Sequence, residues 1–174
     1  MSSIWTQTAS LPQFDSLTRS IKTDVLIIGG GIAGLLCAYR LKEAGVPCVL
    51  VEADRICSGV TMDTTAKITV QHGLIYQKLL REFGTERTKL YLEANGKALE
   101  EYRSLCACID CDFQAQDSAV YSLQGKQKIE QELEALQQIG YHAVFQPQLS
   151  LPFPIDGAVQ FPDQAQFHPL KFLR

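Results

Sequence analysis

The chain has 174 residues, enough for one ordinary domain or for one domain and part of another. Hydrophobic residues make up 46% of it and charged residues 20%, a composition typical of a globular protein with its own core. The net charge of -3 is small, and the sequence contains no block of like charges. Neither feature supports binding to a nucleic acid or to a charged membrane surface.

The N-terminal region and the cysteines indicate the cellular compartment in which the protein is expected. Residues 1–20 are polar and lack the apolar core of a secretory signal, and no apolar run is long enough to span a bilayer. The six cysteines are expected to be reduced thiols, because a chain able to build a core without a secretory signal has little need of disulfides. We therefore expect a cytoplasmic protein that does not contact a membrane.

The first elements form one unit. Residues 1–23 are predicted to be a loosely structured arm. Residues 24–28 are an apolar run that ends in glycine, typical of a parallel strand buried on both faces. Residues 33–44 favour a helix that ends before Gly45 and Pro47, and residues 48–51 favour a second strand that ends at Glu52. This order predicts a β-α-β unit.

The rest of the chain mixes helices and strands. Residues 55–69, rich in Ser, Gly and Thr, are predicted to be an extended loop. Helices are predicted at 74–83, 85–109 and 126–139, and strands at 119–123 and 141–145. In the second helix a buried stripe is expected at Leu90, Ala94, Ala98, Tyr102 and Leu105. Residues 147–169 hold five prolines and are predicted to be extended and irregular, before a helical turn that starts at Pro169.

The glycines between the first strand and the first helix carry the clearest motif. Gly29, Gly31 and Gly34 form G-x-G-x-x-G, in which the glycines allow a tight turn, a close approach of the backbone to a pyrophosphate, and close packing of helix on strand. The helix that begins near Ile32 points its N–H groups and its positive dipole end at that pyrophosphate. Glu52 ends the second strand, where its carboxylate accepts hydrogen bonds from a ribose. The alternative is a structural glycine turn that binds no ligand.

The acidic residue narrows the choice of ligand. A carboxylate at Glu52 repels the 2′-phosphate of NADP, so the ligand is expected to have a free ribose. The fingerprint leaves both FAD and NAD open.

Several segments together resemble a known family. Residues 23–35, with 51–53 and 58–61, resemble the D-amino-acid-oxidase-like family of FAD-dependent oxidoreductases. Within that family, residues 64–69 and 71–76 are similar to a bacterial branch whose members often carry a C-terminal Rieske iron–sulfur domain. Residues 151–154 and 164–170 also look like that branch.

The resemblance implies an FAD enzyme that oxidises a C–N bond of an amine or amino acid. It implies that the cofactor contacts follow the chain from the ADP half of FAD towards the flavin ring. The ADP half would contact Gly29, Gly31, Ile32, Ala33, Gly34, Glu52 and Ala53, the pyrophosphate side Arg55, Ser58, Gly59 and Thr61, and the ring Thr64, Thr65 and Lys67. A surface lysine in a loop is the alternative for Lys67, and no catalytic residue is assigned. Met62 departs from the family pattern, in which a smaller residue is expected.

The resemblance also fixes the expected organisation. The fold class is α/β, with an incomplete Rossmann-type FAD-binding domain and part of a mixed α+β substrate domain. The predicted parts are an arm at 1–23, the FAD-binding unit and flavin-side loop at 24–73, and a partial substrate domain at 74–174. The resemblance implies the N-terminal part of a longer enzyme whose partner is a small-molecule amine or amino acid. The alternative is a non-catalytic or incomplete nucleotide-binding module that needs a second chain or the missing C-terminal part.

Two further patterns are weaker. Cys106, Cys108 and Cys111 form C-x-C-x-x-C, but a structural zinc site needs four ligands and no fourth is evident, so we favour small buried residues at a helix end and predict no metal. His72 and His168, like the third histidine His142, are isolated in sequence, and we assign none of them a catalytic role.

Overall fold

A computed structural model describes residues 3–174, which divide into two compact units. Unit 1 contains the described residues up to Ala66, together with Ile109–Asp112 and His168–Arg174. Unit 2 contains Lys67–Cys108 and Phe113–Phe167. The chain therefore leaves unit 1 twice, after Ala66 and after Asp112, and ends in it.

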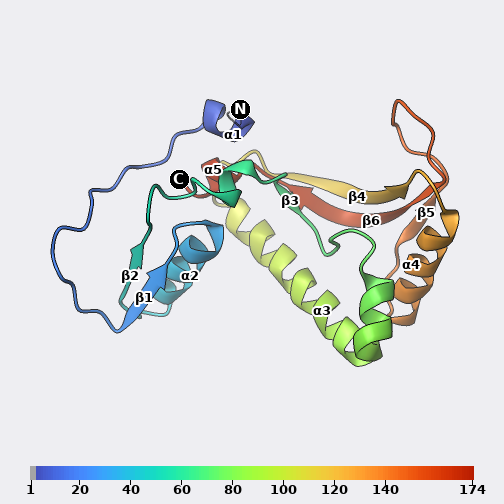
Figure 1. Cartoon of the computed structure of the whole chain (residues 1–174), viewed down its shortest axis with the longest axis horizontal. Helices are drawn as coiled ribbons and strands as arrows, with labels where there is room; N and C mark the ends of the chain where they lie inside the picture. The colour runs from blue at the N-terminus through green and yellow to red at the C-terminus, as the bar shows by residue number, and fades with distance from the viewer. Residues whose placement is uncertain (1–2) are drawn as a thin grey trace. The chain divides into compact units, whose positions relative to one another are not determined.

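The β-α-β unit of unit 1 is present as predicted. Strand β1 (Val25–Ile28), helix α2 (Ile32–Glu43) and strand β2 (Cys48–Val51) follow one another, and β1 pairs with β2 in parallel, with Val25 opposite Cys48 (Figure 1). Helix α2 packs against both strands. Gly45, just after the helix, has a φ of +70°, a conformation that glycine adopts without strain.

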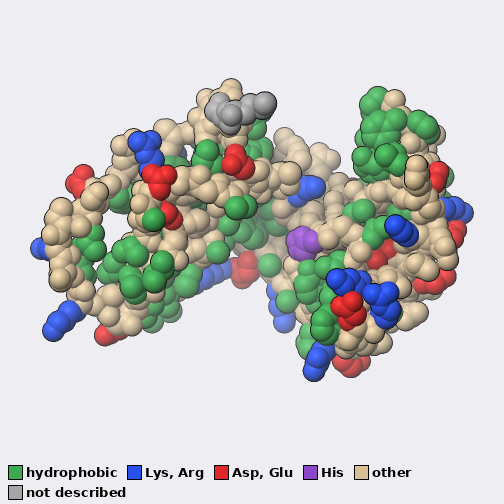
Figure 2. Space-filling view, viewed as in Figure 1, with side chains coloured by type: hydrophobic (Ala, Val, Ile, Leu, Met, Phe, Trp, Pro, Cys, Tyr) green, Lys and Arg blue, Asp and Glu red, His purple; other side chains and the backbone are tan. Residues whose placement is uncertain are grey.

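The burial expected for the first strand was wrong. Leu26 is 53% exposed and Ile28 is 82% exposed, while Val25 and Ile27 are half-buried. The alternation arises because successive side chains of a strand point to opposite faces, and a two-stranded sheet with α2 packed on it does not enclose both of them. Apolar side chains accordingly reach the surface around β1 and α2 (Figure 2).

Three short helices complete unit 1. Helix α1 (Ile4–Thr8) lies within the segment predicted to be a loosely structured arm, so that prediction was wrong for these five residues. The 3-10 helix η1 (Val60–Asp63) interrupts the predicted extended loop. Helix α5 (Pro169–Phe172) is the expected terminal turn, with Pro169 at its start. Helix α1 contacts both η1 and α5.

Unit 2 is built on an antiparallel sheet. Strand β6 (Gly157–Gln166) pairs with β4 (Gln114–Ser122) on one side, and with β3 (Lys67–Ile68) and β5 (Val144–Gln146) along its other edge. The α/β fold class predicted from the sequence is therefore confirmed. The buried side chains at the centre of the unit include Val159 and Phe161, both with no exposed surface.

The ten-residue strand β6 contradicts the irregular tail expected from the prolines. Pro162 lies inside the strand, at a bulge where Pro162 and Asp163 together face Asp117 of β4. Asp163 has a φ of +56°, and its N–H donates to the Asp117 carboxylate at 3.2 Å instead of to the ladder. Because a bulge residue does not need to donate within the ladder, proline is tolerated at this point.

Two helices accompany this sheet. Helix α3 (Tyr76–Cys106) is broken at Gly84, whose φ is +74°, so the two predicted helices on either side of residue 84 are confirmed. Helix α4 (Lys126–Gln138) matches its predicted range to within one residue.

The stripe expected on α3 was wrong at Leu90, Ala94 and Ala98, which are exposed, while Tyr102 and Leu105 are half-buried. Leu90 is 63% exposed, whereas Thr88, Leu99 and Cys106 are buried. Both sets have helical spacing, and Thr88 enters the buried set because its hydroxyl donates to the Gly84 carbonyl at 2.8 Å.

Among the described residues, the cysteines are not joined by disulfides. Of the C-x-C-x-x-C set, Cys106 and Cys111 are buried and Cys108 is exposed. Within residues 3–174, no group of three His, Cys, Asp or Glu side chains is placed to hold a metal ion. Over the same residues, none of the helices has both the length and the apolar character that crossing a membrane requires.

Candidate functional site

The turn between β1 and α2 depends on glycines with different surroundings. Gly29 has a φ of +107°, and its N–H donates to the Val51 carbonyl at 2.8 Å, which ties the turn to β2. A Cβ on Gly34 would lie 2.0 Å from the Gly29 carbonyl oxygen, so only glycine lets α2 pack this closely on the strand. A Cβ on Gly31 would meet Thr61 Oγ1 at 3.3 Å and no other described atom within 4 Å. The space in front of Gly31 is what a pyrophosphate at the start of α2 needs.

Glu52 is fixed across this turn by backbone donors. Its Oε2 accepts from the Gly30 N–H at 2.7 Å, and its Oε1 accepts from the N–H groups of Ala53 at 2.8 Å and Asp54 at 3.2 Å. These bonds, above all the one from Gly30, lower the pKa of Glu52 below its ordinary value. The side chain is therefore an anion at neutral pH. It is also exposed, and a carboxylate has enough lone pairs to accept from ribose hydroxyls as well.

The loop after β2 folds back over the glycine turn. The Cys57 N–H donates to the Gly30 carbonyl at 2.9 Å, and the buried Thr61 accepts from the Ile32 N–H through Oγ1 at 3.0 Å. Burial, followed by the nearby Glu52 charge, raises the pKa of the Cys57 thiol, so this cysteine stays protonated and is a poor nucleophile. The loop thus contributes a backbone that shapes the turn and a hydroxyl at the start of α2.

The other predicted cofactor residues are distributed along the same segments. In unit 1, Ser58 and Thr64 are half-buried and the remaining ones are exposed, namely Ala33, Ala53, Arg55, Gly59 and Thr65. Lys67 belongs to unit 2, where it is exposed and begins β3 opposite Gln166. The structure therefore brings the turn, Glu52 and Thr61 together within unit 1 and places Lys67 in the other unit.

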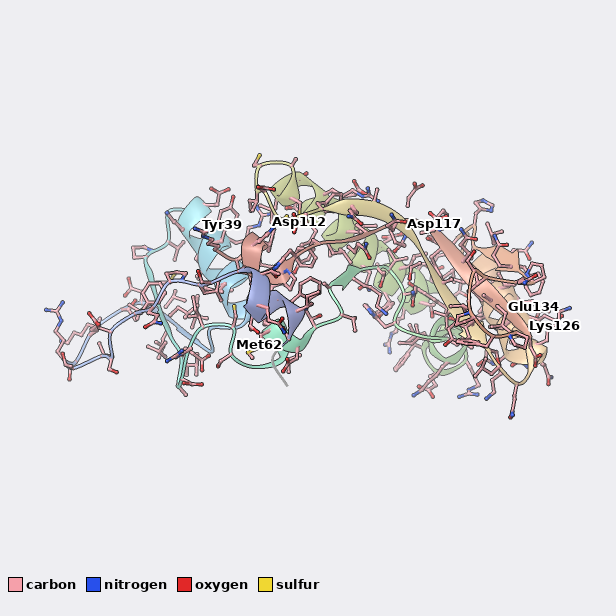
Figure 3. All side chains as sticks on the ribbon, turned by 90° about the horizontal axis from the view of Figure 1, so that it is seen from above. Tyr39, Met62, Asp112, Asp117, Lys126 and Glu134 are labelled. Carbon is pink, nitrogen blue, oxygen red and sulfur yellow. The ribbon has the colours of Figure 1, made fainter. Side chains whose placement is uncertain are left out.

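Met62, the departure from the family pattern, is half-buried in η1 (Figure 3). Its N–H donates to the Gly59 carbonyl at 3.1 Å and so helps to close the 3-10 turn.

Sequence reasoning missed three contributors. Gly30 is the middle glycine of the turn, and its N–H makes the shortest of the hydrogen bonds to Glu52. Trp5 donates from Nε1 to the Thr64 carbonyl at 2.9 Å, and nothing in the polar N-terminal segment indicated this contact. His168 is buried and caps α5 through its side chain. A signal existed for His168, because a proline at the first helical position marks the preceding residue as the N-cap.

This arrangement suits one half of a dinucleotide. A helix N-terminus favours an anion such as a pyrophosphate, through its positive dipole end and the N–H groups of its first turn. A fixed carboxylate at the end of the next strand favours ribose hydroxyls and disfavours a phosphate on the ribose. The open side of Gly31 and the exposed Glu52 therefore fit the ADP half of FAD, by observations independent of any likeness to other proteins.

Comparison with known proteins supports this interpretation. Residues 24–174 match the family described as FAD dependent oxidoreductase (DAO). The Bacillus subtilis (strain 168) protein YhfW, whose name describes a Rieske 2Fe-2S iron–sulfur protein, is 38% identical over 174 residues. The match covers 98% of this chain and 34% of YhfW, so the chain spans about a third of the length of this relative.

Two solved structures have a similar fold. L-proline dehydrogenase from P. horikoshii has a TM-score of 0.66 at 16% identity, over 87% of this chain and 40% of that one. L-amino acid deaminase from Proteus vulgaris has a TM-score of 0.65 at 16% identity, over 94% of this chain and 39% of that one. At this identity the likeness concerns the fold. With the family match over residues 24–174, it confirms the resemblance predicted from the sequence: the chain belongs to the DAO family of FAD-dependent oxidoreductases.

Proposed function

We propose that this chain supplies the FAD-binding turn of an oxidoreductase that oxidises a C–N bond of an amine or amino acid. The observation that carries the proposal is the Glu52 carboxylate, held by three backbone N–H groups next to the open side of Gly31. When bound, FAD supplies the chemistry, accepting a hydride from the substrate carbon so that an imine forms, which water then hydrolyses. We also propose a cytoplasmic location, a FAD-binding part at 24–73 and a partial substrate domain at 74–174.

The residues of the turn have distinct tasks. Gly31 leaves room for the pyrophosphate, and the N-terminus of α2 stabilises its charge. Glu52 accepts from the ribose, while its bonds to Gly30 and to the residues after it keep the carboxylate in place without a change of rotamer. The Thr61 oxygen orients the first turn of α2 by accepting from the Ile32 N–H, and its own O–H is available to donate to the pyrophosphate.

The pyrophosphate-side and ring-side contacts are also part of the proposal. We infer that Arg55, Ser58, Gly59 and Thr61 follow the pyrophosphate and that Thr64, Thr65 and Lys67 contact the flavin. A lysine near the ring would stabilise its anionic reduced form. The family match and the position of Thr64 on the loop that follows η1 support this assignment.

The substrate class rests on the proteins of similar fold. The two solved structures are named for proline dehydrogenation and for amino-acid deamination. Both names describe a reaction of an amino acid. We therefore propose an amine or amino-acid substrate for the enzyme to which this chain contributes.

One observation favours a second candidate. Leu26 and Ile28 are largely exposed on β1, and β1 pairs only with β2 in the part of the chain that the structure describes. An exposed apolar strand at a sheet edge is normally covered by further polypeptide. The alternative proposal is therefore a nucleotide-binding module that acts only when another chain or segment covers this sheet.

Visible absorption of the purified chain distinguishes the two candidates. The matched variants are Gly31→Ala and Gly96→Ala, since both glycines have negative φ values. A Cβ on Gly96 meets open space, and a Cβ on Gly31 meets only Thr61 Oγ1, at 3.3 Å, so that this side chain must shift by a few tenths of an ångström. We expect flavin bands in the wild-type chain and in Gly96→Ala. Gly31→Ala should lose them while keeping its far-UV circular dichroism, because the added methyl group occupies the space reserved for the pyrophosphate.

Each result bears on one candidate. Equal flavin content in the two variants would contradict the role given to Gly31. A wild-type chain that stays colourless after incubation with FAD would contradict binding by this chain alone and favour the second candidate.

A further inference from the structure

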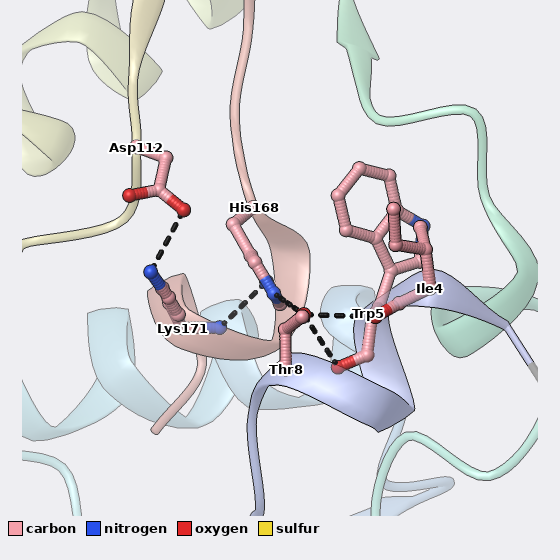
Figure 4. Close-up of polar contacts among 6 residues, drawn as sticks. All are labelled: Ile4, Trp5, Thr8, Asp112, His168 and Lys171. Atoms are coloured by element: carbon pink, nitrogen blue, oxygen red, sulfur yellow. Dashed lines mark hydrogen bonds and ion pairs between the residues drawn. The ribbon is translucent and has the colours of Figure 1, made fainter.

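Helix α1 is held in unit 1 by the side chain of His168 (Figure 4) and by the backbone carbonyl of Thr64. The Trp5 ring meets the His168 ring edge-on, with 4.9 Å between centroids, and Thr8 Oγ1 lies 2.9 Å from His168 Nε2. On its other side, Trp5 donates to the Thr64 carbonyl at 2.9 Å. The five-residue helix thus connects α5 to the loop that follows η1.

The hydrogen bonds of His168 define its protonation state. The backbone N–H of Lys171 donates to Nδ1 at 3.2 Å, so Nδ1 must carry a lone pair. The proton of the neutral ring is therefore on Nε2, which donates to Thr8 Oγ1. The Thr8 hydroxyl in turn donates to the Ile4 carbonyl at 2.8 Å. Each ring nitrogen has a single role in this chain of bonds, and the neutral ring alone satisfies both.

Protonation of the ring would disrupt this arrangement. A proton on Nδ1 would face the Lys171 N–H, donor against donor, at a side chain that is only 4% exposed. Burial is the main cause that lowers the pKa of His168 below 6.5, and the Lys171 ammonium adds to it. The Asp112 carboxylate acts in the opposite direction.

The charges around the ring come from three of the four segments in contact. Lys171 of α5 is paired with Asp112 at 2.8 Å, and Asp110 of the same segment acts on Lys171. Cys111 of that segment accepts the His168 N–H at 2.7 Å through its carbonyl. The 3-10 helix η1 carries Asp63, which is exposed, and α1 carries no charged residue.

Helix α1 depends on these contacts. Five residues are too few for a helix that is stable in isolation. Residues 12–24, which connect α1 to β1, are exposed throughout. Loss of the contacts with His168 and Thr64 would therefore release α1 without unfolding the β-α-β unit.

We propose that Trp5, Thr8 and His168 form an acid-released latch that positions the Thr64 loop. With His168 neutral, the latch is closed and Trp5 holds the Thr64 carbonyl in place. With His168 protonated, Nδ1 no longer accepts from the Lys171 N–H, the ring moves away from that donor, and this movement separates Nε2–H from Thr8 and releases α1. Because Thr64 is assigned to the flavin side, the consequence for FAD rests on the proposed function, whereas the latch itself does not.

Trp5 is the only tryptophan in the chain, so its fluorescence reports the latch directly. We would measure its emission maximum and its quenching by acrylamide from about pH 8 to about pH 5. We expect the emission to shift to the red and the quenching constant to rise, with a midpoint below pH 6.5. His168→Gln keeps an N–H donor for Thr8 and does not titrate, so the transition should be absent. A wild-type chain without the transition, or a His168→Gln chain that keeps it, would overturn the latch.

A second pair of variants tests the latch at neutral pH. Thr8→Val removes the hydroxyl that His168 contacts. Thr6→Val makes the same change on the same helix, at a hydroxyl that donates to the Ser3 carbonyl. We expect higher acrylamide quenching of Trp5 in Thr8→Val than in Thr6→Val, with equal far-UV circular dichroism. Equal quenching in the two variants would overturn the latch.

Flavin retention separates this proposal from the proposed function. In a chain that binds FAD, Thr8→Val should release flavin faster than Thr6→Val during gel filtration, and equal release would overturn the positioning of the Thr64 loop. A colourless wild-type chain would contradict the proposed function alone, and the Trp5 measurements would then decide the latch by themselves.

Discussion

Glu132 of α4 caps helix α3 from outside that helix. Its Oε1 accepts from the Tyr76 N–H at 2.8 Å and its Oε2 accepts from the Gln77 N–H at 2.9 Å. Ile75, at the N-cap position of α3, provides no side-chain cap of its own. Glu132 has no exposed surface, so water does not replace these bonds when the side chain is removed.

The structure sets the size of the expected effect of Glu132→Ala. Two N–H groups without acceptors, that of the buried Tyr76 and that of the half-buried Gln77, cost up to about 1–3 kcal/mol each, or up to about 2–6 kcal/mol together. Removing the buried carboxylate also relieves its desolvation penalty, which offsets part of this loss, so we expect unit 2 to lose about 2–4 kcal/mol. A loss of this size is a large fraction of the stability of a typical domain, which is about 5–15 kcal/mol.

Urea unfolding followed by near-UV circular dichroism measures this loss, because Tyr76, Tyr91 and Tyr141 all lie in unit 2. Glu134→Ala is the matched control, since Glu134 is an exposed residue of the same helix (Figure 3). A Glu132→Ala chain within about 0.5 kcal/mol of Glu134→Ala would refute the capping role.

The pH dependence of folding stability tests the role of Glu132 independently. Burial is the main cause that raises the pKa of Glu132 above 4.5, so the folded chain holds this proton more tightly than the unfolded chain does. The contribution of Glu132 to stability is therefore complete below pH 4.5 and falls as pH rises through the folded pKa. The stability difference between the wild-type chain and Glu132→Gln should shrink over that range. If the stability difference between these two chains grew as pH rises, the predicted direction of the pH dependence would be wrong.

Two changes in unit 1 have different expected outcomes. Gly34→Ala puts a methyl group 2.0 Å from the Gly29 carbonyl, so we expect a loss of about 1–3 kcal/mol or more, whereas Gly96→Ala should be neutral or stabilising in thermal unfolding. Equal melting temperatures would contradict the close packing of α2 on β1. Glu52→Gln removes the anion that three N–H groups hold, so we expect ADP to bind about tenfold more weakly by calorimetry, a loss of about 1.4 kcal/mol. Unchanged ADP affinity would contradict the ribose contact.

Local patterns were enough for several elements. The β-α-β unit follows from an apolar run, a glycine turn and a helix that all lie within 28 consecutive positions, residues 24–51. Gly84 divides the two helices of α3 because a φ of +74° suits glycine. Strand β6 was missed because Pro162 indicates irregular structure until the bulge opposite Asp117 removes the need for its missing N–H.

Burial could not be read from the sequence alone. Strand β1 has the apolar composition of a core strand, but its residue Ile28 is 82% exposed, because burial depends on which layers cover the sheet. On α3, the spacing of the apolar residues allowed more than one buried face. The packing selected the face with Thr88, which satisfies its hydroxyl within its own helix.

The sequence by itself determined the glycine turn, Glu52 and the family, since these depend on residue types at fixed spacing within one short segment. Tertiary structure decided what orients that site. Thr61 meets Ile32 across 29 positions, Trp5 meets Thr64 across 59, and Thr8 meets His168 across 160. Contacts between positions so far apart leave no periodic pattern in the sequence, because each residue type at such a contact also has ordinary solvated roles elsewhere.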